Sequence, residues 1–171
     1  MRRIATVVAF GALLGLFGGV MTASPALARG PRWTFLNFGT HFTEPAVLCG
    51  FTIKGTQLVD KVFVKALKTA DGSMALLGTG ADKISLTANG KTITANISGP
   101  LKVIDFPDGS ATVLAQGRQF VVLAPADAAR FGLPAAFISA GALNESVAAD
   151  GTPTSLSLNG HVLVDVCAAL S

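Results

Sequence analysis

The sequence predicts an all-β protein: a single-domain antiparallel β-barrel or β-sandwich of about seven to nine strands, with one short helix near residues 125–131. Apolar and polar residues alternate with a period of two through most of the chain, which is the pattern of half-buried strands. Turn signals recur between these runs at short intervals, as they do in sandwiches and barrels. No internal repeat, long linker or low-complexity stretch indicates a second domain.

The first 28 residues predict an export signal. An arginine pair at positions 2 and 3 precedes an apolar stretch over residues 4–20, and an Ala-Leu-Ala cleavage site ends at Ala28. The apolar stretch is slightly short for a membrane span, which needs roughly 20 residues, and Pro25 would break a helix. We therefore expect a Sec-type signal at 1–28, cleavage after Ala28, a secreted domain at 29–171 and no membrane span after cleavage.

The charge balance argues against a nucleic-acid partner. Thirteen basic residues stand against ten acidic ones, and two of the basic residues leave with the signal. A nucleic-acid surface needs a clustered excess of positive charge, whereas the lysines here are spread along the chain.

Local signals in the first half of the domain predict strands in order. Segments 34–42, 50–55 and 58–68 have the composition of separate strands. Asn89-Gly90 lies between two alternating runs within 83–98, and this pair predicts a hairpin with a type I′ turn. A second hairpin is expected over 101–117, with its turn at Pro107-Asp108-Gly109.

The second half predicts a further short strand, one helix and a last hairpin. The strand covers about 119–124, and the helix follows because Pro125 fits a first helical turn and Gly132 can end it. Segments 135–148 and 154–169 form the last hairpin, so that Cys167 lies at the end of the last strand. Five apolar residues of that strand share one face by their spacing of two: Leu156, Leu158, Val162, Val164 and Val166.

The two cysteines, Cys49 and Cys167, predict one intramolecular disulfide. Cysteines of an exported protein meet an oxidising compartment, where an even number usually pairs. A reactive thiol pair is the first alternative, but redox motifs place their cysteines close in sequence. A metal site is the second alternative, and it would want more soft ligands than this chain has.

Three segments give the chain a resemblance to a known group. They are CGF at 49–51, ANGKTITANISGP at 88–100 and GHVLVDVCAAL at 160–170, behind a signal peptide. This pattern resembles small exported actinobacterial proteins of uncharacterised function, and the resemblance covers most of residues 45–170. It implies secretion, an all-β fold and pairing of Cys49 with Cys167. It implies no catalytic residue.

No motif in the sequence indicates catalysis, a cofactor or a metal. Nucleophile and metalloprotease motifs are absent. The two histidines, His41 and His161, would form a zinc site with Glu44 only if folding brought them together. His161 and Asp165 share a side of their strand, but they lie about 13 Å apart at roughly 3.3 Å per residue. Five carboxylates show no spacing that selects a glycosidase pair: Asp60, Asp82, Asp105, Glu145 and Asp165.

The aromatic residues leave two functions open. Tyrosine is absent and Trp33 is the only tryptophan, which argues against a carbohydrate-stacking face. The phenylalanines predict a Phe-filled core or, alternatively, an apolar cavity for a small hydrophobic ligand. We therefore expect a secreted, non-catalytic domain with a binding or envelope-associated role. The alternatives are a carrier of a small apolar ligand and an enzyme of unrecognised type. The phenylalanines concerned are Phe35, Phe38, Phe42, Phe51, Phe63, Phe106, Phe120, Phe131 and Phe137.

Overall fold

The structure is a computed structural model that describes residues 7–8, 31–37 and 39–171. The expected cleavage site at Ala28 lies outside the described residues, as does Phe38. The elements are β1 (Val7–Val8), β2 (Thr34–Leu36), β3 (His41–Glu44), β4 (Ile53–Lys68), β5 (Met74–Ala88), β6 (Lys91–Asn96), β7 (Leu101–Asp105), β8 (Ala111–Val122), α1 (Pro125–Phe131), β9 (Ala136–Val147), β10 (Pro153–Asp165) and α2 (Val166–Leu170).

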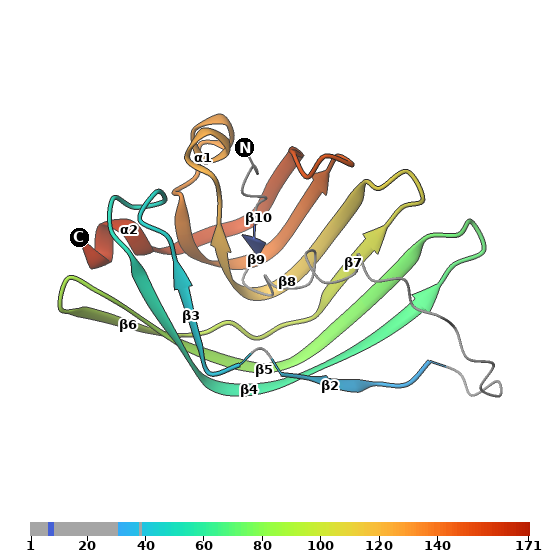
Figure 1. The fold of residues 1–171 in the computed structure, drawn as a ribbon, viewed down its shortest axis with the longest axis horizontal. Helices are drawn as coiled ribbons and strands as arrows, with labels where there is room; N and C mark the ends of the chain where they lie inside the picture. Colours follow the sequence, from blue (N-terminus) through green and yellow to red (C-terminus); the bar gives the residue numbers. More distant parts are fainter. Residues whose placement is uncertain (1–6, 9–30, 38) are drawn as a thin grey trace.

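All the strands belong to one antiparallel sheet. Its order is β10-β9-β8-β7-β5-β4-β2, while β3 pairs β4, β6 pairs β5 and β1 pairs β8. Within the described residues β10 and β2 do not pair, so the sheet is not closed. Figure 1 shows it curved into a trough, with β4 and β5 along one side and β8, β9 and β10 along the other. The predicted antiparallel all-β class is confirmed.

The predicted turns and the predicted helix are present because their signals are local. Asn89 and Gly90 both have positive φ, 50° and 75°, as a type I′ turn requires. At the β7–β8 turn, the Phe106 N–H donates to the Ser110 carbonyl at 2.9 Å. Helix α1 covers residues 125–131 and ends at Gly132, whose φ is 67°.

The division of β4 and β8 into separate segments was wrong. β4 begins at Ile53, inside the predicted segment 50–55, and runs without a break to the end of the segment predicted at 58–68, with a bulge at Leu58. β8 likewise joins the end of the second predicted hairpin to the segment predicted at 119–124. Glycine and polar residues interrupt the alternation in both places, but neighbouring strands keep the ladder continuous across them.

A row of five glycines crosses the sheet where these long strands bend. Gly117 lies opposite Gly141, and Gly141 opposite Gly160. Extending the β5–β7 and β7–β8 registers by two residues places Gly80 opposite Gly99 and Gly99 opposite Gly117. A Cβ at any of the five would lie between 1.8 and 2.6 Å from a carbonyl oxygen of a neighbouring strand. Only glycine permits this close approach of backbones, and we call this row of five residues the glycine crease.

Two hydrophobic clusters lie on the sheet. The first packs Ile84 and Leu86 of β5 with Phe120 of β8, Ile138 of β9 and α2. The second joins residues of β7, β8, β9 and β10 to Ala128 of α1.

The predicted single apolar face of the last strand was wrong. Leu156, Leu158 and Val162 join the second cluster, whereas Val164 joins the first. The bulge at Leu163 lies between the two groups and shifts the register of β10 against β9. One inserted residue exchanges the faces of all residues that follow it.

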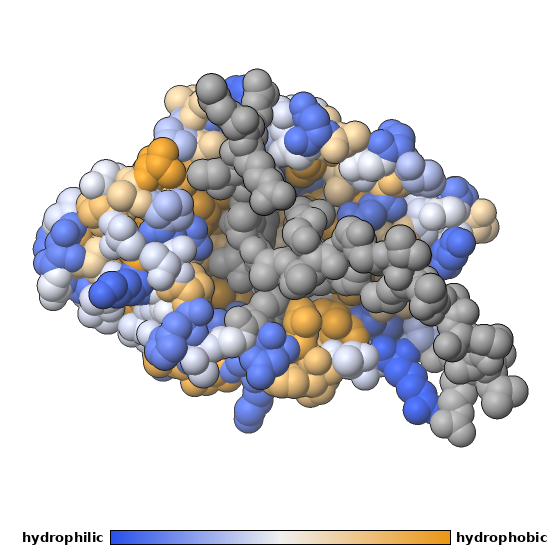
Figure 2. Space-filling view, in the orientation of Figure 1, coloured by the Kyte–Doolittle hydropathy of each residue, from blue (hydrophilic) through white to orange (hydrophobic). Residues whose placement is uncertain are grey.

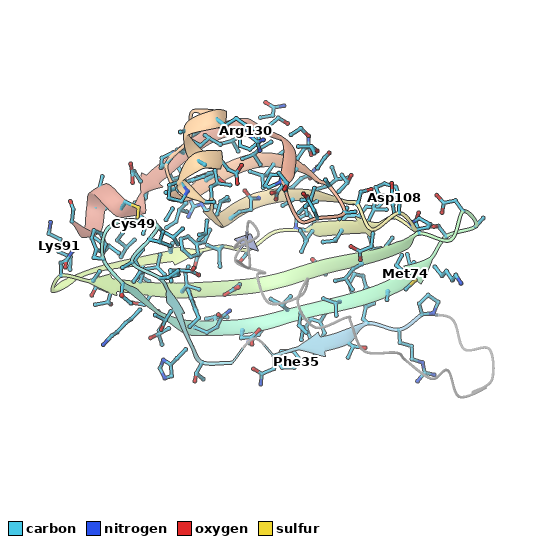
Figure 3. The ribbon with its side chains drawn as sticks, turned by 45° about the horizontal axis from the view of Figure 1, so that its top comes forward. Phe35, Cys49, Met74, Lys91, Asp108 and Arg130 are labelled. Carbon is cyan, nitrogen blue, oxygen red and sulfur yellow. A yellow bond between two sulfur atoms is a disulfide. The ribbon has the colours of Figure 1, made fainter. Side chains whose placement is uncertain are left out.

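The disulfide between Cys49 and Cys167 is present, with a Cα–Cα distance of 5.2 Å. Cys49 lies in the β3–β4 loop, and Figure 3 shows it at the same end of the molecule as Lys91. Cys167 lies in α2, so its predicted place on the last strand was wrong. The helix begins there because the Asp165 side chain accepts the Ala168 N–H at 3.0 Å and caps it.

Further contacts hold α2 against the β5–β6 turn. The Asn89 side-chain amide donates to the Leu170 carbonyl at 2.8 Å, and the Lys91 ammonium donates to the Ser171 carbonyl. Val166 and Leu170 are fully buried in the first cluster. The disulfide therefore fastens a helix that also packs and hydrogen-bonds to the domain.

Candidate functional site

A hollow of about 380 Å³ lies between β6 and the strands β8, β9 and β10, and it is open to solvent on one side. Its walls come from five strands, since Lys83 of β5 and Arg118 of β8 also line it. Pockets that bind small molecules span roughly 300–1,000 Å³. The hollow therefore lies at the small end of that range.

The hollow exists because two neighbouring strands separate. β6 and β7 follow one register along β5, interrupted at residues 97–100. β8 pairs with β7, but β6 has only β5 as a partner in the described sheet. The last contacts before the separation are the Gln116 N–H to the Pro100 carbonyl at 2.9 Å and the Arg118 N–H to the Ser98 carbonyl at 3.2 Å. Beyond them, the two strands form the sides of a wedge.

Ser98 stabilises the backbone at the point of separation. Its hydroxyl accepts the Asp82 N–H at 2.9 Å and donates to the Asp82 carbonyl at 3.1 Å. A side chain thus supplies hydrogen bonds that a strand residue would otherwise supply.

The walls of the hollow combine aliphatic side chains with two cations. Ile138 is 1% exposed and belongs to the first cluster, while Leu163, the bulge residue of β10, is 40% exposed. The charged members are Lys83 and Arg118, and no carboxylate lines the hollow with them. Among the described residues, neither cation forms an ion pair. The hollow is therefore positively charged and partly apolar.

Two carboxylates that the sequence could not pair lie side by side. Asp60 of β4 and Asp82 of β5 are cross-strand partners, and directly opposed residues have Cβ atoms about 4.5–5.5 Å apart. Burial raises the pKa of Asp82 from 3.8 to about 6, with a further contribution from the Asp60 charge. The Gln57 amide opposes this shift by donating to Asp82 at 2.6 Å. Asp82 is only 2% exposed, so a substrate cannot reach it.

The candidate zinc ligands do not converge. His41 and Glu44 both lie on strand β3, and their odd spacing points them to opposite faces. His41 is exposed beside the Thr56 hydroxyl, whereas burial raises the pKa of Glu44. His161 lies on β10, at the opposite end of the strand order from β3 and β4. Within the described part of the chain, no three His, Cys, Asp or Glu residues form a possible metal group.

The phenylalanines only partly fill the core. Phe120 and Phe137 are fully buried, and Phe42 packs against Phe120 with ring centroids 6.3 Å apart. Phe35 and Phe63 contact each other edge to face, yet they are 48% and 43% exposed. Figure 3 shows Phe35 on the outside of the β2 side of the sheet, and Figure 2 shows apolar surface among polar side chains. The prediction of a Phe-filled core therefore holds for part of the set only.

Sequence reasoning missed Lys83 and Arg118 as site residues. They lie 35 positions apart on strands that are not paired with each other. No spacing rule links them, and only the separation of β6 from β8 brings them to one hollow. No protein-family model, curated protein or solved structure matches the chain.

Proposed function

We propose that this chain is an exported, non-catalytic protein that binds a small, partly apolar molecule in the hollow between β6 and β8–β10. The observation that carries the proposal is the hollow itself, with an aliphatic wall and two cations that form no ion pair with any residue that the structure describes. Ligand sites combine a few placed polar groups with apolar surface in a concavity, and this hollow has both, with polar groups at least as prominent as apolar ones.

Export is supported by the leader pattern and by the disulfide. Cys49 and Cys167 are joined, and a persistent structural disulfide is typical of secreted proteins. Among the described residues, no helix combines the length and apolar character that crossing a bilayer requires. The mature protein in this proposal comprises residues 29–171.

The absence of catalysis is supported by the geometry of the polar groups. The one carboxylate pair that the sheet brings together has a buried member, Asp82, held by the Gln57 amide. Neither histidine lines the hollow. A general acid or base must come within hydrogen-bond reach of its substrate, and neither Asp82 nor a histidine lines the hollow.

A purely apolar cargo receives less support than a mixed one. The largest aromatic side chains of the interior, Phe120 and Phe137, are packed within the clusters. The hollow that remains has charged and polar groups beside its aliphatic wall. The hydrophobic-carrier hypothesis is therefore narrowed to ligands that also carry a polar group.

Native mass spectrometry of the protein purified from the culture medium tests this proposal. We expect a chain that starts at residue 29, lacks two hydrogens because of the disulfide, and retains a small-molecule mass. Leu163→Trp should remove the retained mass by filling the hollow. Leu114→Trp, which enlarges an exposed leucine of β8 outside the hollow, should keep it. An intact leader, two free thiols, or retention that Leu163→Trp leaves unchanged would contradict the proposal.

A further inference from the structure

The two cations of the hollow constrain what the ligand can be. Lys83 extends from β5 and Arg118 from β8, so each reaches the same space from a different strand. Each lacks an ion-pair partner among the described residues. Two like charges that line one hollow repel each other. An anion placed between them would remove this repulsion and form charge-assisted hydrogen bonds.

The neutral groups of the hollow fit the same ligand class. Ile93 and Ala95 of β6 and Leu163 of β10 provide aliphatic surface, while Thr94 and Asn96 alternate with the former two along β6 and line the hollow at the edge of the strand. The outer edge of β6 has no strand partner in the described sheet, so its backbone groups on that side are not used by a ladder. The hollow therefore combines cationic, polar and aliphatic residues within one small volume.

The bulge in β10 contributes directly to the aliphatic wall. Leu163 is the residue inserted at the register shift between Val162 and Val164. Bulges re-aim side chains and occur often beside functional sites. Val162 and Val164 pair with the adjacent residues Ser139 and Ile138 of β9, so Leu163 is left without a ladder partner.

We propose that the ligand is an anionic amphiphile: a molecule with one acidic head group, a carboxylate or a phosphate monoester, on a short aliphatic body. The head lies between Lys83 and Arg118, and the body lies along Ile93, Ile138 and Leu163. This inference rests on the proposed function, because it names the ligand of the same hollow.

Calorimetric titration of the purified secreted protein tests the inference with three probes that share a ten-carbon chain. They are decanoate, decyl phosphate and the uncharged decanol. We expect at least one charged probe to bind about tenfold or more tightly than decanol, because a hydrogen bond to a charged group contributes about 1.5–3 kcal/mol. The tighter of the two charged probes identifies the head group.

Variants separate the charge from the shape of the hollow. Lys83→Met and Arg118→Met should each lower the affinity for the charged probe by about tenfold to a hundredfold. Neither variant should change the affinity for decanol. Arg118→Lys should retain part of the affinity, and Lys54→Met, an exposed lysine of β4 outside the hollow, should retain all of it. Circular dichroism melting of each variant reports whether the fold is kept.

The outcomes distinguish the inference from the proposed function. Two results would refute the proposal of an anionic head group while leaving the proposed binding function intact. They are equal affinity for the charged and uncharged probes, and binding of the charged probe that neither Met variant weakens. If no probe binds and Leu163→Trp leaves the retained mass unchanged, the hollow is not a binding site. The inference and the proposed function are then both refuted.

Discussion

Asp82 makes the stability of this domain depend on pH, with a sign opposite to that of an ordinary salt-bridged carboxylate. Burial raises the pKa of Asp82 from 3.8 to about 6 in the folded state. The folded state therefore binds this proton more tightly than the unfolded state. The stabilising contribution is complete below about pH 4 and is lost as the pH rises through 6.

The magnitude follows from the size of the shift. One pKa unit corresponds to about 1.4 kcal/mol, so the rise to about 6 corresponds to a loss of roughly 2–3 kcal/mol between pH 4 and pH 7.5. Asp82→Asn should remove this loss, because the amide stays neutral and still accepts the Gln57 amide hydrogen. The variant should be more stable than the parent by roughly 2 kcal/mol at pH 7.5 and nearly equal to it at pH 4.

Urea unfolding followed by circular dichroism at both pH values measures the difference, with the disulfide intact. Asp108→Asn is the matched control, since the pKa of Asp108 is lowered by its bonds to Ser110 in an exposed turn. That control should gain no stability at pH 7.5. The raised pKa of Asp82 would be refuted by an Asp82→Asn variant that is less stable than the parent at pH 7.5, or by one that gains the same stability at both pH values.

Three further predictions concern the fold. Replacing Cys49 and Cys167 together by Ser should lower the free energy of unfolding by about 4 kcal/mol in urea titration, because the bond closes a loop with a sequence separation of 118; an unchanged midpoint would show that the bond adds nothing. Gly141→Ala should cost more than about 2 kcal/mol, since φ is 126° and a carbonyl oxygen lies 2.3 Å from the new Cβ. Gly132→Ala, with positive φ but open space, should cost only about 1 kcal/mol in the same assay, and equal losses would contradict the crease. Phe42→Ala should lower the thermal midpoint and the stability by about 2–3 kcal/mol, because its ring covers a strand glycine and packs on the first cluster; loss of less than about 0.5 kcal/mol would contradict this packing.

The features that the sequence predicted well are those whose cause is local. Asn89-Gly90 defines its turn by positive φ at two adjacent residues. Pro125 and Gly132 define the two ends of α1 in the same way. The disulfide was predictable because two cysteines allow a single intramolecular pairing.

The features that it could not predict depend on contacts between distant strands. Gly117 and Gly141 read individually as interruptions, and only the register shows that they face each other. Helix α2 has five residues, too few for a periodic pattern, and it is held by its cap and by tertiary contacts. Lys83 and Arg118 share a hollow only because β6 and β8 separate.

The glycine crease has a consequence for how the domain unfolds. Three of the strands that cross it, β8, β9 and β10, serve both hydrophobic clusters, whereas β5 serves the first only. β8, for example, gives Val113 and Ala115 to the second cluster and Phe120 and Val122 to the first. The same strands thus run through both clusters, and no linker separates them. One cluster therefore cannot unfold while the other stays folded. The two clusters are not independent folding units, because they share these strands. The domain should therefore lose its structure in a single cooperative transition.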